Sequence, residues 1–262
     1  WDVAAQYQWH GAPYQSEISL LRAAGTLTLS SAWHTRSGWH LRAGLVEAEL
    51  KIDAAQRAHA SGSITGLTLG THDGTLALDG VDIEGEGNWS VTNGIARIGA
   101  QLRLARGRLD MGVLHAQLPQ APVDLALDAR RGVDAVWDIA QLNWRDPDVL
   151  EFDAAARFDP RELAPLRRLQ LHQARAVFPL ALQRYGRGVL AAQELNDLAL
   201  VGELRGSAEL DGEGLIRAAA ATDRLDLREP QRAISIEGLR GGLDWRRDGH
   251  GEIRPLSFAH AR

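Results

Sequence analysis

The residues best suited to chemistry in this 262-residue chain are carboxylates that recur in close pairs. Glu47 and Glu49 stand two positions apart, as do Glu84 and Glu86, so on a β-strand both members of a pair lie on one face. Glycoside hydrolysis needs two carboxylates in one cleft, one of them with a raised pKa. The same pairs arise wherever a strand faces water, and we favour this second interpretation.

A second group of carboxylates comprises Asp146, Asp148, Glu151 and Asp153. A calcium site needs several hard oxygen ligands that converge on one loop. The glycine-punctuated spacing of known calcium loops is missing here, and Glu151 and Asp153 alternate with apolar residues. We therefore interpret the group as a solvated turn followed by the water-facing side of a strand.

Histidines are scattered, apart from His34 and His40, which flank a predicted turn at residues 35–38. A zinc site needs several converging ligands, and the sequence has no His-x-His or His-Glu-x-x-His pattern. Cysteine is absent, which excludes disulfides and thiolate-bound metals. The sequence therefore predicts neither a metal nor a cofactor.

Motifs for nucleophilic catalysis and phosphate binding are also missing. There is no Gly-x-Ser-x-Gly elbow. Two Gly-x-Gly loops, at 85–87 and 212–214, carry a central glutamate that repels phosphate. The formal net charge is −5 and the basic residues form no stripe, which excludes nucleic acid as a partner. These observations predict a protein that is not an enzyme.

Eight tryptophans are spread along the chain, and Trp33 and Trp39 flank the predicted turn at 35–38. Such rings either pack across a hairpin or form a platform on which sugars stack. A carbohydrate-binding or carbohydrate-active β-protein therefore stays open as an alternative.

Alternation of apolar and polar residues with a period of two dominates the chain. In residues 46–53 apolar side chains at even positions alternate with charged ones, and the run 133–139 begins with Val133 and Ala135 on its apolar side. Each run places one strand face in an apolar medium and the other in water, which is typical of antiparallel sheets. The large residues predicted to line the apolar face are Val46, Leu50, Ile52, Leu102, Leu104, Leu125, Leu127, Ile139, Phe152 and Phe158.

Turn signals separate these runs at residues 35–38, 72–74, 92–94, 211–212 and 247–249. Gly66, Gly80 and Gly202 interrupt the alternation and suggest β-bulges. The spacing predicts roughly fifteen strands joined as a meander.

Two segments depart from the strand pattern. Asp159 and Pro160 form a helix start, which predicts a short helix through about Leu166. Apolar residues at helical spacing predict a second, amphipathic helix within 179–195. We expect a single elongated β segment over residues 1–262, with a possible seam at 159–195. Because the chain opens at Trp1, we expect it to be part of a longer protein.

The stretch from residue 158 to residue 245 carries a family pattern. Residues 198–206 read Leu-Ala-Leu-Val-Gly-Glu-Leu-Arg-Gly, and 236–245 read Ile-Glu-Gly-Leu-Arg-Gly-Gly-Leu-Asp-Trp. Phe158-Asp159-Pro160 and Phe178-Pro179-Leu180 precede them. This third of the chain resembles the AsmA-like/TamB/YdbH group of bacterial envelope proteins.

The resemblance implies a periplasmic protein, anchored in the inner membrane and reaching the membranes through parts outside this segment. It implies a long antiparallel meander, curled into an open groove, that shields a phospholipid or another acyl-chain lipid during transport for outer-membrane homeostasis. Small inward residues such as Ala48, Ala100 and Ala154 leave room for acyl chains. A β-sandwich is the alternative fold, and a structural or adhesive β-domain is a further alternative function.

Overall fold

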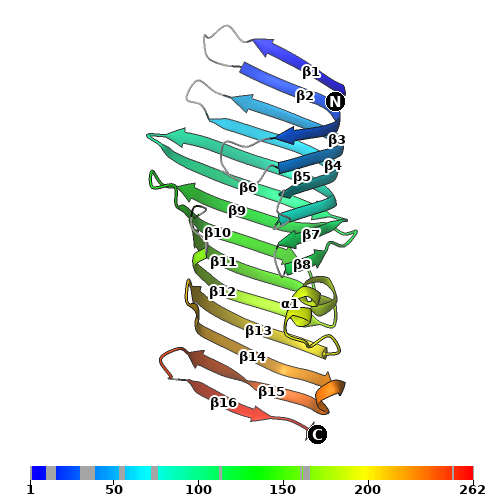
Figure 1. Ribbon diagram of the computed structural model, residues 1–262, viewed down its shortest axis with the longest axis vertical. Coiled ribbons are helices and arrows are strands. Elements are labelled where there is room, and N and C mark those ends of the chain that lie inside the picture. Colours follow the sequence, from blue (N-terminus) through cyan, green and yellow to red (C-terminus); the bar gives the residue numbers. More distant parts are fainter. Residues whose placement is uncertain are drawn as a thin grey trace. The chain divides into compact units, whose positions relative to one another are not determined.

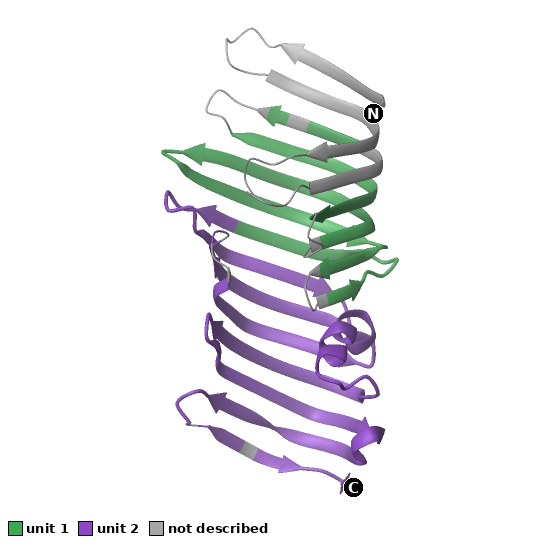
Figure 2. Cartoon of the chain, in the orientation of Figure 1, with its two compact units in different colours: residues 1–128 green, residues 129–262 purple. Residues whose placement is uncertain are grey.

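The computed structural model describes residues 2–9, 16–29, 39–52, 57–71, 76–111, 114–159, 161, 166–249 and 251–261. The protein is mainly β, as the sequence predicts: in each unit the described strands form an open, curled antiparallel meander, and they do not close into the alternative sandwich. The chain forms two compact units, residues 1–128 and 129–262 (Figure 2). The residues predicted as a seam, 159–195, lie inside the second unit.

Unit 1 is built from long strands that pair in chain order. Its strands are β1 (Asp2–Trp9), β2 (Ser16–Leu29), β3 (Trp39–Ile52), β4 (Ala58–Thr71), β5 (Leu76–Thr92), β6 (Ile95–Ala105), β7 (Arg108–Met111), β8 (Leu114–Gln117) and most of β9 (Val123–Arg131). Strands β1 to β6 are antiparallel neighbours in succession. The register therefore shows which residues of neighbouring strands lie opposite each other, which alternation alone does not determine.

Strands β6 and β7 form one strand with a corner. β6 pairs with residues 82–92 of β5, and β7 pairs with residues 76–79 of the same strand. Arg106 and Gly107, at the corner, have φ angles of 59° and 68°. The amide of Arg106 donates to the carbonyl of Pro119 at 2.7 Å, and that of Leu118 donates to Gly107 at 3.1 Å, so the returning chain turns the same corner. The strand bends here without losing its partners.

Unit 2 continues the same construction. Its strands are the end of β9, then β10 (Trp137–Asp146), β11 (Leu150–Phe158), β12 (Leu166–Phe178), β13 (Ala199–Asp211), β14 (Gly214–Glu229), β15 (Ile234–Arg246), β16 (Glu252–Ser257) and β17 (His260–Ala261). Strands β10 to β16 pair antiparallel in chain order, and β17 also pairs with β15. A helical segment, with a π-helical turn (Leu182–Gly186) and α1 (Arg187–Ala192), joins β12 to β13 (Figure 1).

Bulges keep one side of these long strands apolar where the alternation changes phase. The register shifts between Ile64 and Leu67 on β4, and again where β5 passes Gly80. Gly66 and Gly80 have φ angles of 65° and 67°, which glycine adopts at little cost. The amide of Gly66 donates to Oδ1 of Asp82 on the neighbouring strand at 2.9 Å. The bulges predicted at these two glycines are confirmed.

The bulge predicted at Gly202 is wrong. Gly202 keeps regular register with Phe178 on β12 and with Leu225 on β14. A Cβ atom at this position would lie 2.2 Å from the carbonyl oxygen of Arg224. Glycine is needed here because the neighbouring backbone approaches closely, not because an extra residue is inserted.

The predicted turn at 92–94 is confirmed, since Asn93 and Gly94 both have positive φ, 51° and 76°, as a type I′ hairpin turn requires. The turns predicted at 35–38 and 72–74 lie outside the described residues. Turns at 212–213 and 247–248 confirm two further predictions.

Three further predictions concern local structure, and their outcomes differ. Val133 and Ala135 do not belong to a strand: they form a turn, with Ala135 at φ 64° and β10 beginning only at Trp137. The helix predicted from Asp159 falls mainly on residues outside the described set, and Leu166 already belongs to β12. The helix predicted within 179–195 is confirmed as the segment that ends with α1.

Candidate apolar binding face

One face of the unit 2 sheet is apolar across seven strands. Directly paired residues of antiparallel strands lie on the same face, so each chain of pairings traces a row across the sheet. One such row crosses β10 to β16 and comprises Trp144, Phe152, Ala174, Gly206, Ala220, Leu243 and Ile253. A neighbouring row comprises Leu142, Ala154, Leu171, Ala208, Ala218 and Trp245. We call the face that carries these rows the unit 2 apolar face.

The unit 2 apolar face is covered at one end and open at the other. Trp144 on β10 is only 7% exposed, whereas Leu243 on β15 is 46% exposed and Ile253 on β16 is 68% exposed. Small residues occupy the middle of both rows, among them Gly206, Ala218 and Ala220. Alanine and glycine rows give a shallow surface that offers apolar contact without filling the space above it.

Unit 1 has a matching apolar face, again defined by register. One row comprises Val46, Ile64, Ile83 and Leu104, and the next comprises Ala48, Gly62, Gly85 and Leu102. A Cβ on Gly62 would lie 2.2 Å from the carbonyl oxygen of Glu47, and one on Gly85 would lie 2.1 Å from that of Gln101. The close backbone approach therefore requires glycine at these two positions of the row.

The register places most of the predicted lining residues in these faces. Positions 46, 50 and 52 belong to the unit 1 apolar face with Leu102 and Leu104, although the side chains of Val46, Leu50 and Ile52 lie outside the description. Leu125 and Leu127 alternate on β9 with the exposed Asp124 and Asp128. In unit 2, Ile139, Phe152 and Phe158 pair with Ala156, Trp144 and Trp137 on the apolar face. That these residues line a lipid groove stays a prediction.

A helical segment covers the β10 end of the unit 2 apolar face. Tyr185 meets the Trp144 indole edge to face, with centroids 5.9 Å apart and an interplanar angle of 87°. Trp144 in turn stacks on Phe152, at 6.4 Å and 7°. Ala181 and Tyr185 are buried, whereas α1, which is described throughout, buries no side chain. The first turns of the segment therefore make the contact with the sheet.

Asp146 anchors this segment, in an environment that differs from the one expected from the sequence. Asp146 pairs with Leu150 on the apolar face and is buried, so its interpretation as part of a solvated turn is wrong. Arg184 Nη1 donates to both carboxylate oxygens, at 2.7 and 2.6 Å, and the hydroxyl of Tyr185 donates to Oδ2 at 2.8 Å. Burial, followed by the hydrogen bond with Asp146, raises the pKa of Tyr185 above its ordinary value.

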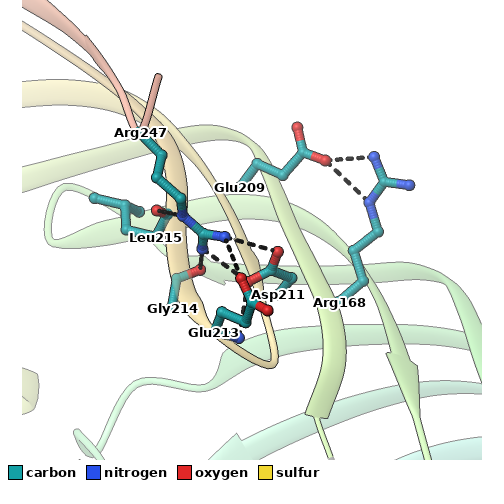
Figure 3. A network of polar contacts seen from close by, with 7 residues as sticks. All are labelled: Arg168, Glu209, Asp211, Glu213, Gly214, Leu215 and Arg247. Atoms are coloured by element: carbon teal, nitrogen blue, oxygen red, sulfur yellow. Dashed lines mark hydrogen bonds and ion pairs between the residues drawn. The ribbon is translucent and has the colours of Figure 1, made fainter. Parts of the chain in front are cut away.

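The opposite face of unit 2 carries ladders of charged residues. Arg168 on β12 donates through Nε to Glu209 on β13 at 3.0 Å, and Arg217 on β14 pairs with Asp244 on β15 at 2.7 Å (Figure 3 shows the first pair). Arg175 donates to Glu203 at 2.8 Å. The hydrogen bond from Arg175, together with a second one from Arg205, holds the pKa of Glu203 below its ordinary value.

Arg247 closes one end of the β13–β14 hairpin. Its guanidinium donates to Asp211 Oδ1 at 2.8 Å and to the carbonyl oxygens of Gly214 and Leu215, at 2.8 and 2.9 Å (Figure 3). The hydrogen bonds from Arg247 hold the pKa of Asp211 below its ordinary value. A strand end is fixed to its neighbours here, so the pair has a structural role.

The carboxylate pairs considered for catalysis lie on the polar side of the sheet. Glu84 and Glu86 pair with Arg103 and Gln101, on the face opposite Leu102 and Leu104. Glu84 is 65% exposed and lies 3.5 Å from Arg103. A carboxylate that acts as an acid catalyst typically lies in an apolar cleft, whereas Glu84 is exposed to solvent on an open sheet face.

The metal and sugar sites weighed in the sequence were also compared with the part of the chain that the structure describes. No group of three or more His, Asp or Glu residues there could hold a metal ion. Asp153, from the acidic group weighed as a calcium site, accepts hydrogen bonds from Arg145 and Asn143, which lower its pKa. His34 and Trp33 fall outside the described residues. Trp144 packs against other aromatic rings rather than forming an open platform.

Comparison with known proteins does not point to a family or a function. No family model, curated protein or solved structure matches the chain. Among the described residues, no helix combines the length and apolarity needed to span a bilayer. The two apolar faces and the sequence resemblance are therefore the features that point to a function.

Proposed function

We propose that the apolar faces of this chain hold the acyl chains of lipids, and that the protein shields them from water during transport in a bacterial cell envelope. The observation that carries the proposal is the unit 2 apolar face, which continues across seven strands and ends in the exposed Leu243, Trp245 and Ile253. Soluble proteins rarely expose contiguous apolar surface of this kind without a binding role.

The chemistry of the face suits an alkyl chain. Its rows of Ala, Gly, Leu and Trp offer apolar contact, and an alkyl chain has no hydrogen bonds to satisfy. Transfer of each methylene from water to such a surface contributes about 0.8 kcal/mol. A sugar, by contrast, needs polar partners, and the carboxylate pairs at Glu84 and Glu86 lie on the other face of the sheet.

The resemblance of residues 158–245 to the AsmA-like/TamB/YdbH group supports the same proposal. A periplasmic site of action, attachment to the inner membrane and contact with either membrane follow from that resemblance, and they are proposed on it alone. Neither an enzymatic step nor a cofactor is part of the proposal.

Native mass spectrometry of gently purified protein, with lipid extraction from the same sample, tests the proposal. We expect co-purified phospholipid or another acyl-chain lipid in the wild-type protein and its loss in Leu243→Asp. Val201→Asp is the matched control: Val201 is 54% exposed, pairs with Asp226 and lies on the polar face of β13. Leu102→Asp and Leu125→Asp extend the test to predicted lining residues of unit 1.

Two results would overturn the proposal that the apolar faces bind lipid. A wild-type protein that is folded, free of lipid and unable to take up an added fatty acid would show that the apolar faces are not lipid sites. Equal lipid retention in Leu243→Asp and Val201→Asp would show that the lipid is bound elsewhere.

A further inference from the structure

The two ends of the unit 2 apolar face differ in a way that the sheet itself does not explain. Within one row of paired residues, exposure rises from 7% at Trp144 to 46% at Leu243 and 68% at Ile253. All three belong to the same face by register. The difference arises because the helical segment that joins β12 to β13 packs over Trp144 and leaves the β15–β16 end open.

The contact between the helical segment and the sheet centres on the carboxylate of Asp146, a charged group that is unfavourable on an apolar face. Asp146 belongs to that face, opposite Leu150, and burial of an unpaired carboxylate is strongly unfavourable. Arg184 supplies the counter-charge and two hydrogen bonds, and Tyr185 supplies a third, so the carboxylate is satisfied only when the segment is in place. This arrangement fixes the segment on the sheet at one defined position.

The anchored residues also occupy the space in which a ligand would lie. The phenol ring of Tyr185 lies perpendicular to the Trp144 ring, which stacks on Phe152 of the next strand. An acyl chain that followed the row from Ile253 towards β10 would meet this aromatic cluster. Within residues 180–192 only Ala181 and Tyr185 are buried, whereas Leu180 and Val189 are exposed, so Tyr185 is the one large side chain that the segment buries against the sheet.

We propose that residues 180–192 form an internal end stop, with Tyr185 as its blocking side chain. The end stop limits bound acyl chains in unit 2 to the part of the face formed by β13 to β16. It rests on the proposed lipid-binding function and adds to it a boundary for the ligand, set by the Asp146–Arg184–Tyr185 cluster.

A photoreactive fatty acid maps the boundary directly. The full chain is irradiated with a diazirine-bearing fatty acid, and labelled peptides are identified by mass spectrometry. We expect labelling within residues 199–257 and only background labelling within residues 142–156. In Tyr185→Ala, labelling should extend into residues 142–156, whereas Arg187→Ala, in the exposed part of the segment, should keep the wild-type map.

A second variant keeps the proposal testable if Tyr185→Ala fails to fold. Residues 180–197 are replaced by a short Gly-Ser linker together with Asp146→Leu, which removes the segment and the carboxylate it neutralises. Circular dichroism checks the sheet in each variant, and the labelling map of the wild-type protein tests the boundary without any variant.

The outcomes separate the two proposals. Equal labelling of residues 142–156 and 199–257 in the wild-type protein would overturn the end stop and leave lipid binding standing. An unchanged map in both variants would also overturn it. Labelling no higher than that of an unrelated soluble β-protein would overturn lipid binding and the end stop together.

Discussion

The hydroxyl of Tyr185 donates a hydrogen bond of 2.8 Å to Oδ2 of Asp146, a residue 39 positions earlier in the chain. Arg184, its neighbour, contacts both oxygens of the same carboxylate. The interaction joins the helical segment after β12 to the end of β10. Because Asp146 is buried, these two side chains are what make its position on an apolar face tolerable.

Removal of either partner of Asp146 should therefore destabilise the protein. We expect Arg184→Ala to lower the free energy of unfolding by about 3–5 kcal/mol, because it leaves a buried charge uncompensated. Tyr185→Phe, which removes one hydrogen bond and keeps the ring, should lower it by about 1–3 kcal/mol. Urea unfolding followed by circular dichroism measures both. Arg187→Ala, at an exposed position of α1, should change the value by no more than about 0.5 kcal/mol. Equal effects of all three variants would contradict the anchoring role.

The Arg247–Asp211 pair predicts a loss of stability in acid. Its hydrogen bonds lower the pKa of Asp211 in the folded state below the ordinary value of 3.8. A lowered folded pKa means that the unfolded chain binds the proton more readily. The contribution is therefore complete above the unfolded pKa and disappears as the pH falls through the folded one.

Unfolding free energies measured from neutral pH down to about pH 3 test this linkage. We expect Asp211→Asn to be less stable than the wild-type protein at neutral pH and to lose less stability on acidification. Asp223→Asn, at a highly exposed carboxylate, is the control and should follow the wild-type curve. If the free energy of unfolding of Asp211→Asn fell with pH as steeply as that of the wild-type protein, the pair would contribute nothing to the loss of stability in acid.

The fold was predictable where it depends on local pattern. Period-two alternation fixes which side of a strand is apolar, and Asn93-Gly94 carries the turn chemistry of a hairpin. Alternation can also continue past the end of a strand, which is why Val133 and Ala135 were placed in a strand although they form a turn. The periodicity contains no signal for the left-handed conformation of Ala135.

The site was less predictable because its decisive contacts are distant in sequence. Asp146 stands beside other acidic residues, and sequence alone favours solvation for such a group. Its partners come 38 and 39 positions later, across two strands and a connection. The rows of the apolar faces depend on register, which alternation does not determine. One signal was available: the helical spacing of residues 182–192 indicated a segment with an apolar side that had to pack on something.

Close backbone approach at Gly202 predicts an asymmetry between two glycines of unit 2. A Cβ at Gly202 would lie 2.2 Å from the carbonyl oxygen of Arg224, whereas one at Gly212 has nothing within 4 Å. We expect Gly202→Ala to lower the free energy of unfolding by about 1–3 kcal/mol, because strands β13 and β14 must separate to admit the methyl group. Thermal unfolding compares the two variants. If Gly212→Ala were as destabilising as Gly202→Ala, the backbone contact would not be the cause.

The small residues in the rows of the unit 2 apolar face predict that a bulky apolar side chain placed there should weaken ligand binding, although it adds no polarity. Ala220 lies on the apolar face between Gly206 and Leu243, while the adjacent Ala219 pairs with Ser207 and Asp244 on the polar face. Ala220→Phe should fill the space above the small residues and exclude an acyl chain from it. Loss of contact with about two methylenes corresponds to roughly tenfold weaker binding.

Titration with a fluorescent fatty acid measures this difference, with Ala219→Phe as the matched control on the same strand. Both variants add the same ring to β14, so effects of strand propensity cancel between them. We expect weaker binding only in Ala220→Phe, with both variants folded by circular dichroism. Tighter binding in Ala220→Phe would mean that the ligand stacks on the sheet surface, because an added ring would then extend its contact area. In that case the small residues of the row would serve strand packing alone.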